Sequence, residues 1–352
     1  MNSLELDRFV SSAWDAGGTD VLLTTGSKPF IRVDGAIRRL EDEPEFHADH
    51  ILSILSDVLT TDQFERSATD DVDFALTWRS TARLRGSAFR QRNEPALALR
   101  IIPDRIPGLD DLGVPPAVRT MATLSHGLVL FTGPTGSGKS TTQAALIDWI
   151  NQTQQKHILT IEEPLEYLHR HKASAVSQRE VGTDTESFPK ALRSALREDP
   201  DVILVGEMRD LDSIQIALTL AETGHLVIST LHTNDAPQAL DRIVDVFPGD
   251  GQPQIRIQLA GCLAGVVAQR LVPRIGGGRV AAYEVLVAST AVRNLIREGK
   301  TRQIRNVIST SRAEGMQTLE HHLSELVKTG TISADDARKH AVVPNELTTT
   351  NR

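Results

Sequence analysis

The segment Gly133-Pro134-Thr135-Gly136-Ser137-Gly138-Lys139-Ser140 constrains this chain more than any other part of its sequence. It follows the apolar run 128–131, which is typical of a buried strand, and a helix is expected to begin within it. Glycines allow backbone N–H groups to close around phosphate oxygens. The order of strand, glycine-rich loop and helix therefore predicts a P-loop that binds a nucleoside triphosphate, with the positive end of the helix dipole directed at the phosphates.

The side chains of this loop have separate chemical functions in binding a triphosphate. Lys139 can reach the β and γ oxygens of a triphosphate, and the Ser140 hydroxyl can ligate Mg²⁺. The residues predicted to bind the nucleotide are Gly133, Pro134, Thr135, Gly136, Ser137, Gly138, Lys139, Ser140 and Thr141. Kinases, GTPases and motor ATPases all use such a loop, so the loop alone does not decide the reaction.

Composition restricts the class of protein further. The chain has 352 residues, 40% of them hydrophobic and 24% charged, which favours a soluble globular protein of two domains. A net charge of −8 argues against a protein whose main task is to grip nucleic-acid phosphates. The single cysteine, Cys262, excludes an intramolecular disulfide and favours a reducing cytoplasm. We expect neither a signal peptide nor a membrane span, so any membrane contact is expected through a partner.

The pattern of apolar residues divides the chain into four parts. Residues 1–102 alternate helical and strand signals, which predicts a small α+β domain. Four prolines and two glycines make 103–116 the expected linker. From 117 to 341, apolar strand-like runs alternate with helical segments and then give way to helices, which predicts a mostly parallel sheet covered on both faces. Residues 342–352 lack periodicity, so we expect a frayed tail.

Acidic residues follow two of the predicted strands. Glu162, Glu163 and Glu166 come after the apolar run 158–161, and Glu207 comes after the run 202–205. Hydrolysis of a nucleotide needs a carboxylate to orient or deprotonate water and another near Mg²⁺. Carboxyl ends of adjacent parallel strands are a suitable place for both groups. The alternative interpretation is a pair of solvated acidic turns.

Histidines and arginines supply further candidates. His225 and His232 flank the predicted strand 226–229, although a single histidine at a strand end is more often structural than catalytic. His321 and His322 are expected on an exposed helix and are given no role. Several arginines crowd the end of the first domain, either as solvated polar faces of strands or as cations that reach the γ-phosphate in a neighbouring subunit. They are Arg79, Arg83, Arg85, Arg90, Arg92, Arg100 and Arg105.

Four motifs together resemble the ATPases of type II secretion and type IV pilus systems. They lie at 133–142, 161–167, 199–210 and 221–225. The resemblance covers nearly the whole chain, and within the class it is strongest to the pilus retraction ATPases. The segments that carry this closer resemblance are 176–182, 291–300 and 315–319.

The resemblance implies a PAS-like domain over 1–102 and, after the linker, a RecA-like motor domain over 117–341 with a helical C-terminal part. It also implies a ring of six subunits with each ATP site between adjacent subunits. Lys139 and Ser140 match the Walker A pair, Glu166 the glutamate that activates water, and Glu207 the Walker B glutamate near Mg²⁺.

Further residues match family motifs. His225 and His232 correspond to the histidine-box residues, and Arg83, Arg85 and Arg100 lie where the first domain supplies arginines across the subunit interface. Two departures stand out. Glu163 replaces the usual Asp, a mild change because the carboxylate remains, and residues 18–23 match the N-terminal pattern only loosely.

The expected function is accordingly a hexameric motor that couples ATP hydrolysis, with Mg²⁺, to type IV pilus retraction. Its expected partners are further copies of itself and an inner-membrane platform protein, with no nucleic acid. Its expected location is the cytoplasm, peripheral to the inner face of the cell membrane. The alternatives are a pilus-assembly or type II secretion ATPase, and an accessory subunit that binds ATP without hydrolysing it. A single cysteine fits poorly with the four-cysteine zinc site common in the assembly and secretion branches.

Overall fold

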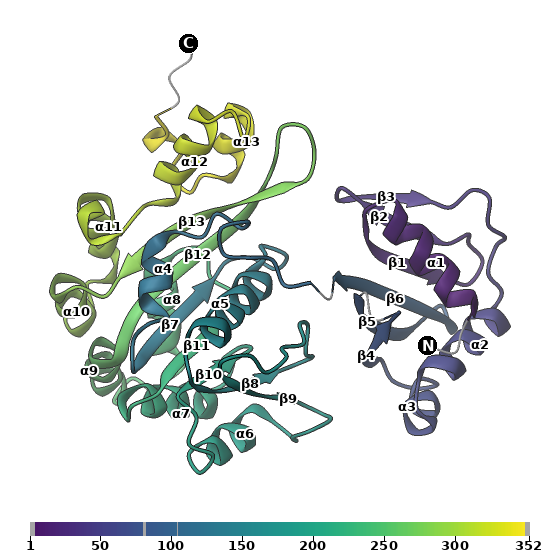
Figure 1. Ribbon diagram of the computed structural model, residues 1–352, viewed down its shortest axis with the longest axis horizontal. Coiled ribbons are helices and arrows are strands. Elements are labelled where there is room, and N and C mark those ends of the chain that lie inside the picture. The colour runs from purple at the N-terminus through teal and green to yellow at the C-terminus, as the bar shows by residue number, and fades with distance from the viewer. Residues whose placement is uncertain (1–3, 80–81, 104, 349–352) are drawn as a thin grey trace. The chain divides into compact units, whose positions relative to one another are not determined.

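The computed structural model describes residues 4–348 except 80, 81 and 104, and it consists of two units (Figure 1). Unit 1 takes in the described residues up to Ile106 together with the segment Pro164–Leu168. Unit 2 takes in Pro107–Glu163 and the described residues from His169 onward. The division after Ile106 falls within 103–116, the range expected to link two domains.

Unit 1 is built on an antiparallel sheet with the strand order β3-β2-β1-β6-β5-β4. Its elements are α1 (Leu4–Asp15), β1 (Gly18–Thr24), β2 (Phe30–Val33), β3 (Ala36–Arg39), α2 (Ala48–Val58), α3 (Thr61–Arg66), β4 (Val72–Trp78), β5 (Ala82–Gln91) and β6 (Glu94–Pro103). Every second residue of β5 from Ala82 to Ala88 is buried, and Leu84 shares a core with Phe9 of α1 and Ile54 of α2. One face of the sheet is therefore buried against helices.

A two-residue turn fixes the pairing of β5 with β6. Arg92 and Asn93 both have positive φ, 51° and 65°, which is the backbone of a type I′ turn and suits the twist of an antiparallel pair. The resulting register sets Arg85 directly opposite Arg100, and Arg83 lies two residues from Arg85 on the same face. The three arginines singled out in the sequence therefore share one face of this hairpin.

Unit 2 is built on a sheet with the strand order β13-β12-β7-β11-β10-β8-β9, in which all neighbours are parallel except β12 and β13 (Figure 1). The strands are β7 (Gly127–Thr132), β8 (His157–Glu162), β9 (Ala175–Glu180), β10 (Val202–Val205), β11 (Leu226–Thr230), β12 (Leu263–Pro273) and β13 (Arg279–Val287). The helices around them are α4 (Pro116–Met121), α5 (Lys139–Thr153), α6 (Phe188–Ala195), α7 (Leu211–Glu222), α8 (Ala236–Asp245) and α9 (Gln252–Cys262).

Helices cover both faces of this sheet. Every residue of β7 and of β11 is buried. Val227 belongs to the large core that contains residues of α6 to α9. Thr230 points to the other face, where its hydroxyl donates to Gln143 of α5 at 3.0 Å. The expectation of a mostly parallel sheet between two layers of helices is confirmed.

The hairpin of β12 and β13 was not predicted from the sequence. The helix α9 passes directly into β12 at Leu263, so no loop residues mark the boundary. β12 joins the sheet by pairing with β7, whose Thr132 is paired with Ala268. Cys262, the last residue of α9, lies in the core and is 5% exposed.

The described residues after β13 form four α-helices and three short 3₁₀ turns. They are α10 (Thr290–Arg297), η1 (Thr301–Gln303), α11 (Ile304–Thr310), η2 (Arg312–Glu314), α12 (Leu319–Lys328), α13 (Ala334–His340) and η3 (Pro344–Glu346). The helix α13 begins with a side-chain cap, in which the Ser333 hydroxyl accepts from the N–H of Asp336.

His322 corrects one expectation. It does not lie on an exposed helix face, because its ring stacks on Tyr283 of β13 with the centroids 5.7 Å apart, and its Nδ1 accepts from the Tyr283 N–H at 2.9 Å. Burial lowers the pKa of His322 to about 4. The histidine is therefore a neutral acceptor that joins α12 to the sheet.

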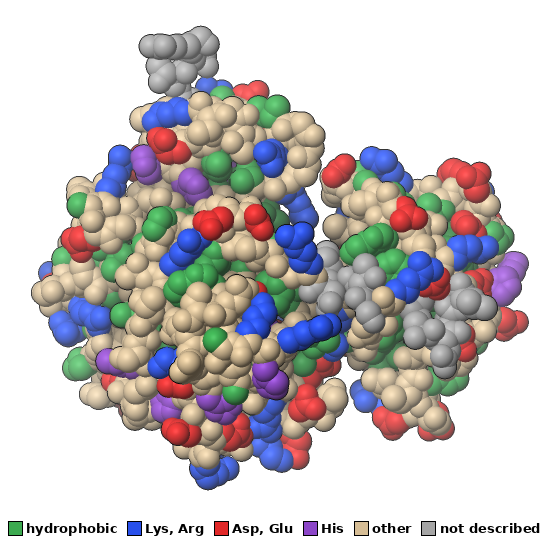
Figure 2. All heavy atoms as spheres, viewed as in Figure 1, with side chains coloured by type: hydrophobic (Ala, Val, Ile, Leu, Met, Phe, Trp, Pro, Cys, Tyr) green, Lys and Arg blue, Asp and Glu red, His purple; other side chains and the backbone are tan. Residues whose placement is uncertain are grey.

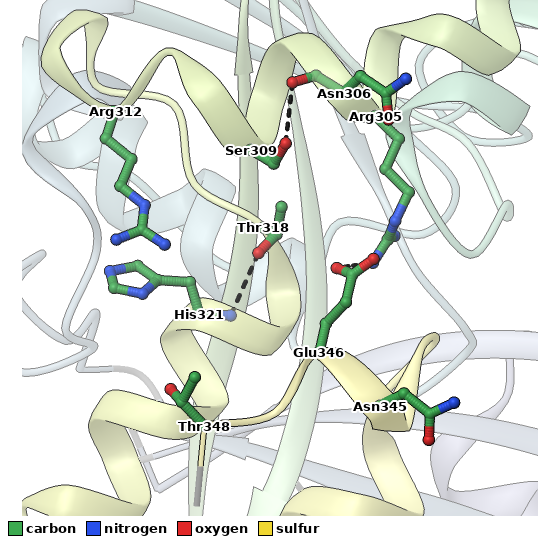
Figure 3. A pocket seen from close by; sticks show the side chains of 9 residues that line it. All are labelled: Arg305, Asn306, Ser309, Arg312, Thr318, His321, Asn345, Glu346 and Thr348. Atoms are coloured by element: carbon green, nitrogen blue, oxygen red, sulfur yellow. Dashed lines mark hydrogen bonds and ion pairs between the residues drawn. The ribbon is translucent and has the colours of Figure 1, made fainter.

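Residues 342–348 also differ from the frayed tail that was expected. The N–H groups of Val342 and Val343 both donate to Glu320 at 2.8 Å, and Glu346 pairs with Arg305 at 2.9 Å. A cavity of about 430 Å³ lies beside this segment (Figure 3), lined by Arg305, Asn306, Ser309, Arg312, Thr318, His321, Asn345, Glu346 and Thr348. None of these lining residues belongs to the predicted nucleotide site.

No helix in the described residues is both long enough and apolar enough to cross a membrane. Lys and Arg side chains are interspersed with Asp and Glu side chains on the face that Figure 2 presents.

Candidate nucleotide site

The P-loop joins β7 to α5 at the carboxyl end of the strand, as the sequence predicts. Gly133, Gly136 and Gly138 have φ values of 142°, 78° and 86°, which side chains other than glycine rarely adopt. A Cβ on Gly133 would also lie 2.3 Å from the carbonyl oxygen of Gln269. Glycine is therefore required both by the curvature of the loop and by its close approach to β12.

Lys139 lies at the first turn of α5 with only 7% of its surface exposed. Its Nζ donates to the carbonyl oxygens of Gly133 at 2.8 Å and Pro134 at 3.0 Å. Ser140, the next residue, is exposed. The lysine is thus held over the loop, and the N-terminal amides of α5 face the same space as the loop.

Three neighbouring strands bring their carboxyl ends to the same edge of the sheet. The order β7-β11-β10 sets the residues after β11 and β10 beside the P-loop strand. The Thr132 hydroxyl donates to the Thr233 carbonyl at 2.6 Å and accepts from the Thr233 N–H at 3.0 Å. This reciprocal pair ties the end of β7 to the segment that carries His232.

Glu207 and His232 meet at this edge. The Glu207 carboxylate lies 2.7 Å from Arg209 Nε and 3.4 Å from His232 Nε2. The Glu207 side chain is 17% exposed, whereas that of Arg209 is 75% exposed. A carboxylate and an imidazole, both partly open to solvent, therefore lie at the ends of the two strands that follow β7 in the sheet, His232 after β11 and Glu207 after β10.

His225 lies at the opposite end of β11 from His232. Its Nδ1 is 3.0 Å from the carbonyl oxygen of Leu220, in the last turn of α7. Within one copy of the chain the structure therefore does not bring the two histidines of the predicted pair together. The role of His225 toward a nucleotide stays a prediction.

Glu166 belongs to the segment Pro164–Leu168, which is part of unit 1. Its carboxylate is 3.9 Å from the Arg85 guanidinium, and Arg83 Nε donates to the Leu165 carbonyl at 2.8 Å. Arg100 pairs with Asp20 of β1 at 3.0 Å. Two of the three selected arginines thus contact the acidic segment of their own chain, and the third contacts an aspartate that sequence reasoning did not single out.

The available donors fit Mg²⁺. Magnesium prefers oxygen ligands and is usually held by one or two protein groups together with substrate phosphates. The Ser140 hydroxyl and the Glu207 carboxylate are oxygen donors of this kind. Among the described residues no group of three or more His, Cys, Asp and Glu side chains is arranged to hold a metal ion by itself.

Sequence reasoning missed Gln269 of β12, whose Nε2 donates to the Ser137 carbonyl beneath the P-loop at 2.8 Å. The available signal was a single amide within the apolar run that begins at Val266. A polar residue in such a run requires a hydrogen-bond partner once it is buried.

The profile of the type II/IV secretion system protein family matches residues 4–277. The chain belongs to this family. The resemblance inferred from the motifs is thereby confirmed. The type IV pilus retraction ATPase PilT of Pseudomonas aeruginosa is 44% identical over 347 residues, which cover 98% of this chain and all of PilT. The type IV pilus ATPase PilU of the same organism is 38% identical over 98% of this chain and 90% of PilU.

A solved structure agrees with these matches. The crystal structure of the pilus retraction motor PilT with bound ADP superposes with a TM-score of 0.88, at 46% identity, over 98% of this chain and 99% of that chain. The mixed α/β architecture, with an antiparallel N-terminal sheet and a mostly parallel second sheet, is therefore that of the retraction ATPases.

Proposed function

We propose that this protein is a ring-forming ATPase motor that drives the retraction of a type IV pilus. The observation that carries the proposal is the P-loop of unit 2 beside the strand-end pair of Glu207 and His232, in a chain similar to PilT over its whole length. Residues 1–102 then act as a PAS-like domain and 117–341 as a RecA-like motor domain. ATP and Mg²⁺ are the expected ligands.

The phosphate loop performs the binding step. Backbone N–H groups of the loop and of the first turn of α5 donate to the phosphates. Lys139 exchanges its bonds to the Gly133 and Pro134 carbonyls for the β and γ oxygens of ATP. Ser140 and Glu207 would hold Mg²⁺, which neutralises charge that develops on the phosphates. Thr141 completes the contact at the start of the helix.

Glu166 performs the hydrolytic step as the base. Its carboxylate orients the attacking water and takes up the water proton, while the γ-phosphoryl group passes to that water and ADP leaves. His232 lies beside Glu207 and keeps the Glu207 carboxylate oriented. In the proposed ring His225 contacts the ATP site of a neighbouring subunit, because within its own subunit it lies at the opposite end of β11 from His232.

Arginines complete the site from the adjacent subunit. Arg83, Arg85 and Arg100 share one face of the β5–β6 hairpin, so the hairpin can present several guanidinium groups to a neighbouring γ-phosphate. A ring of six subunits would give every site such a partner. Light scattering with a nonhydrolysable ATP analogue should then give the mass of six subunits. A monomer at every concentration, also with its platform partner added, would contradict the ring.

In the cell the ring is proposed to lie in the cytoplasm, against an inner-membrane platform protein that it turns. The runner-up functions are a pilus-assembly or type II secretion ATPase, and an accessory subunit that binds ATP without turnover. They differ from the proposal in measurable ways. Loss of retraction with normal pilus assembly in a deletion strain supports the retraction motor, whereas loss of pili supports an assembly motor.

The direct test is steady-state ATP hydrolysis by the purified full-length protein with Mg²⁺, beside Lys139→Ala and Glu166→Gln at equal concentration. We expect turnover in the wild type, loss of nucleotide binding in Lys139→Ala, and retained binding with lost turnover in Glu166→Gln. Binding without turnover in the wild type, with the ring formed and the platform partner present, would favour the accessory subunit.

A further inference from the structure

Gln269 lies where β12 passes beneath the phosphate loop. It is 2% exposed, and it follows Ala268, the residue paired with the last residue of β7. Its carbonyl oxygen lies 2.3 Å from the place where a Cβ on Gly133 would be, and its Nε2 lies 2.9 Å from the same place on Gly138. The first and last glycines of the loop, Gly133 and Gly138, therefore both pack against Gln269.

Among the described residues, the Gln269 side chain makes one hydrogen bond, and that bond goes to the loop backbone. Nε2 donates to the Ser137 carbonyl oxygen at 2.8 Å, within the buried interior. A trans peptide unit is planar, and its C=O and N–H point in opposite directions. Holding the Ser137 carbonyl toward β12 therefore directs the N–H of Gly138 away from β12 and into the concave side of the loop.

The oxygen of the Gln269 side-chain amide is evidence against a role in packing alone. Gln269 Oε1 is buried and has no hydrogen-bond partner within the described part of the chain. An unsatisfied buried oxygen costs stability, and an apolar side chain of the same length would avoid that cost. The amide is thus unfavourable for packing at this position, and its one evident contribution is the bond to the loop.

We propose that Gln269 is a positioning residue for the phosphate loop, which aims the Gly138 N–H at the phosphates by holding the Ser137 carbonyl. The inference rests on the proposed function, because it assigns Gln269 to the ATP site of that function. The residue does not touch the reacting atoms. Its loss is expected to weaken nucleotide binding while leaving the hydrolytic groups in place.

Gln269→Met is the first variant, since it keeps the length and volume of the side chain and removes the donor. In the full-length protein we expect the dissociation constants of fluorescent ATP and ADP analogues, and the KM for ATP, to rise at least fivefold. The kcat at saturating ATP is expected to stay within twofold of wild type. The melting temperature without nucleotide is expected to change little, because removal of the unpaired Oε1 offsets the loss of the donor to the Ser137 carbonyl. A residue needed only for packing would instead lower the melting temperature and leave nucleotide affinity unchanged.

Arg270→Met is the matched control on the same strand. Arg270 points to the other face of the sheet, where it donates to the His340 carbonyl at the end of α13 at 2.8 Å. Its loss should lower the melting temperature and leave nucleotide affinity unchanged. Gln269→Asn serves as a second variant should the methionine protein not fold, because the shorter amide stays polar but no longer reaches Ser137.

The outcomes separate the two proposals. Wild-type affinity and KM in a folded Gln269→Met or Gln269→Asn protein would overturn the positioning role, provided that Lys139→Ala abolishes binding in the same assay. Absence of nucleotide binding in the wild type would overturn the proposed function and this inference with it. Weakened binding in Gln269→Met but not in Arg270→Met supports the inference.

Discussion

Glu207 and Glu320 are both paired with an arginine, but they lie in regions of unit 2 with different chemistry. At the carboxyl edge of the sheet, Glu207 is 17% exposed and its partner Arg209 is 75% exposed. In the C-terminal helix α12, the Glu320 side chain is 1% exposed. Glu320 accepts from Arg305 at 2.7 Å and from the N–H groups of residues 342 and 343.

This difference indicates which polar groups can exchange partners. An ion pair with an exposed partner contributes little to stability, so a ligand can replace that partner at small cost. A buried carboxylate whose oxygens are all engaged cannot leave its partners without a large loss. We infer that the carboxyl edge is organised for binding and that the C-terminal contacts fix the last segment of the chain.

The largest expected effect on stability comes from Glu320→Ala. The change leaves two N–H groups without their acceptor and removes one of the carboxylates around Arg305, so it should lower the free energy of unfolding by about 3–5 kcal/mol. Chemical denaturation measures this loss. Glu325→Ala on the same helix, which removes only an exposed pair with Lys328, is the control and should cost much less. Equal losses in the two variants would contradict the distinction between the regions.

Glu284→Gln should make stability less dependent on pH. Burial raises the pKa of Glu284 from 4.5 to about 7, with Asp235 and Glu320 adding to the rise and the Ala236 N–H and Arg305 opposing it. The folded state then binds this proton more tightly than the unfolded chain. The free energy of unfolding of the wild type therefore falls between pH 4.5 and about 7 and levels off above.

The glutamine variant keeps an acceptor for the Ala236 N–H, which now donates to Glu284 at 2.9 Å, and it has no proton to lose. The free energy of unfolding of the variant should exceed that of the wild type by an amount that grows across the same pH range, to roughly 3 kcal/mol above pH 8. Thermal unfolding from pH 5 to pH 8 measures the difference. A constant difference at every pH would show that Glu284 does not titrate in this range.

Thr132→Val should produce a smaller effect, in the binding region. Valine keeps the shape of a side chain that is fully buried but removes the hydrogen bonds between the Thr132 hydroxyl and Thr233, at a cost of about 1–2 kcal/mol. Because this pair anchors the segment that carries His232, turnover should also fall. Thr132→Ser keeps the hydroxyl and should retain activity. Full turnover in the valine variant would mean that the anchor is dispensable.

Local sequence signals predicted the parts of the site that lie close together in the chain. The strand at 128–131, the glycines after it and Lys139 form one continuous motif, so its geometry follows from residue types alone. Glu207 was found because an acid followed a run of four buried residues.

Contacts between distant segments could not be predicted in the same way. β12 belongs beside β7, more than 130 residues earlier, and it continues α9 without a loop, so the pattern offered no boundary. Gln269 was missed for that reason. Residues 342–348 show no periodicity because side chains of α11 and α12 hold them, chiefly Arg305 and Glu320. His322 could be assigned to its contact with Tyr283 only once β13 was known.

The most direct test of the division between binding and structural regions compares Glu207→Gln with Glu320→Gln in the full-length protein, by ATP turnover and melting temperature. Glu207→Gln should bind ATP, lose turnover and keep the wild-type melting temperature. Glu320→Gln should melt at a lower temperature and keep its turnover per folded molecule. Wild-type turnover in Glu207→Gln would contradict the assignment of the ATP site to the carboxyl edge of this sheet.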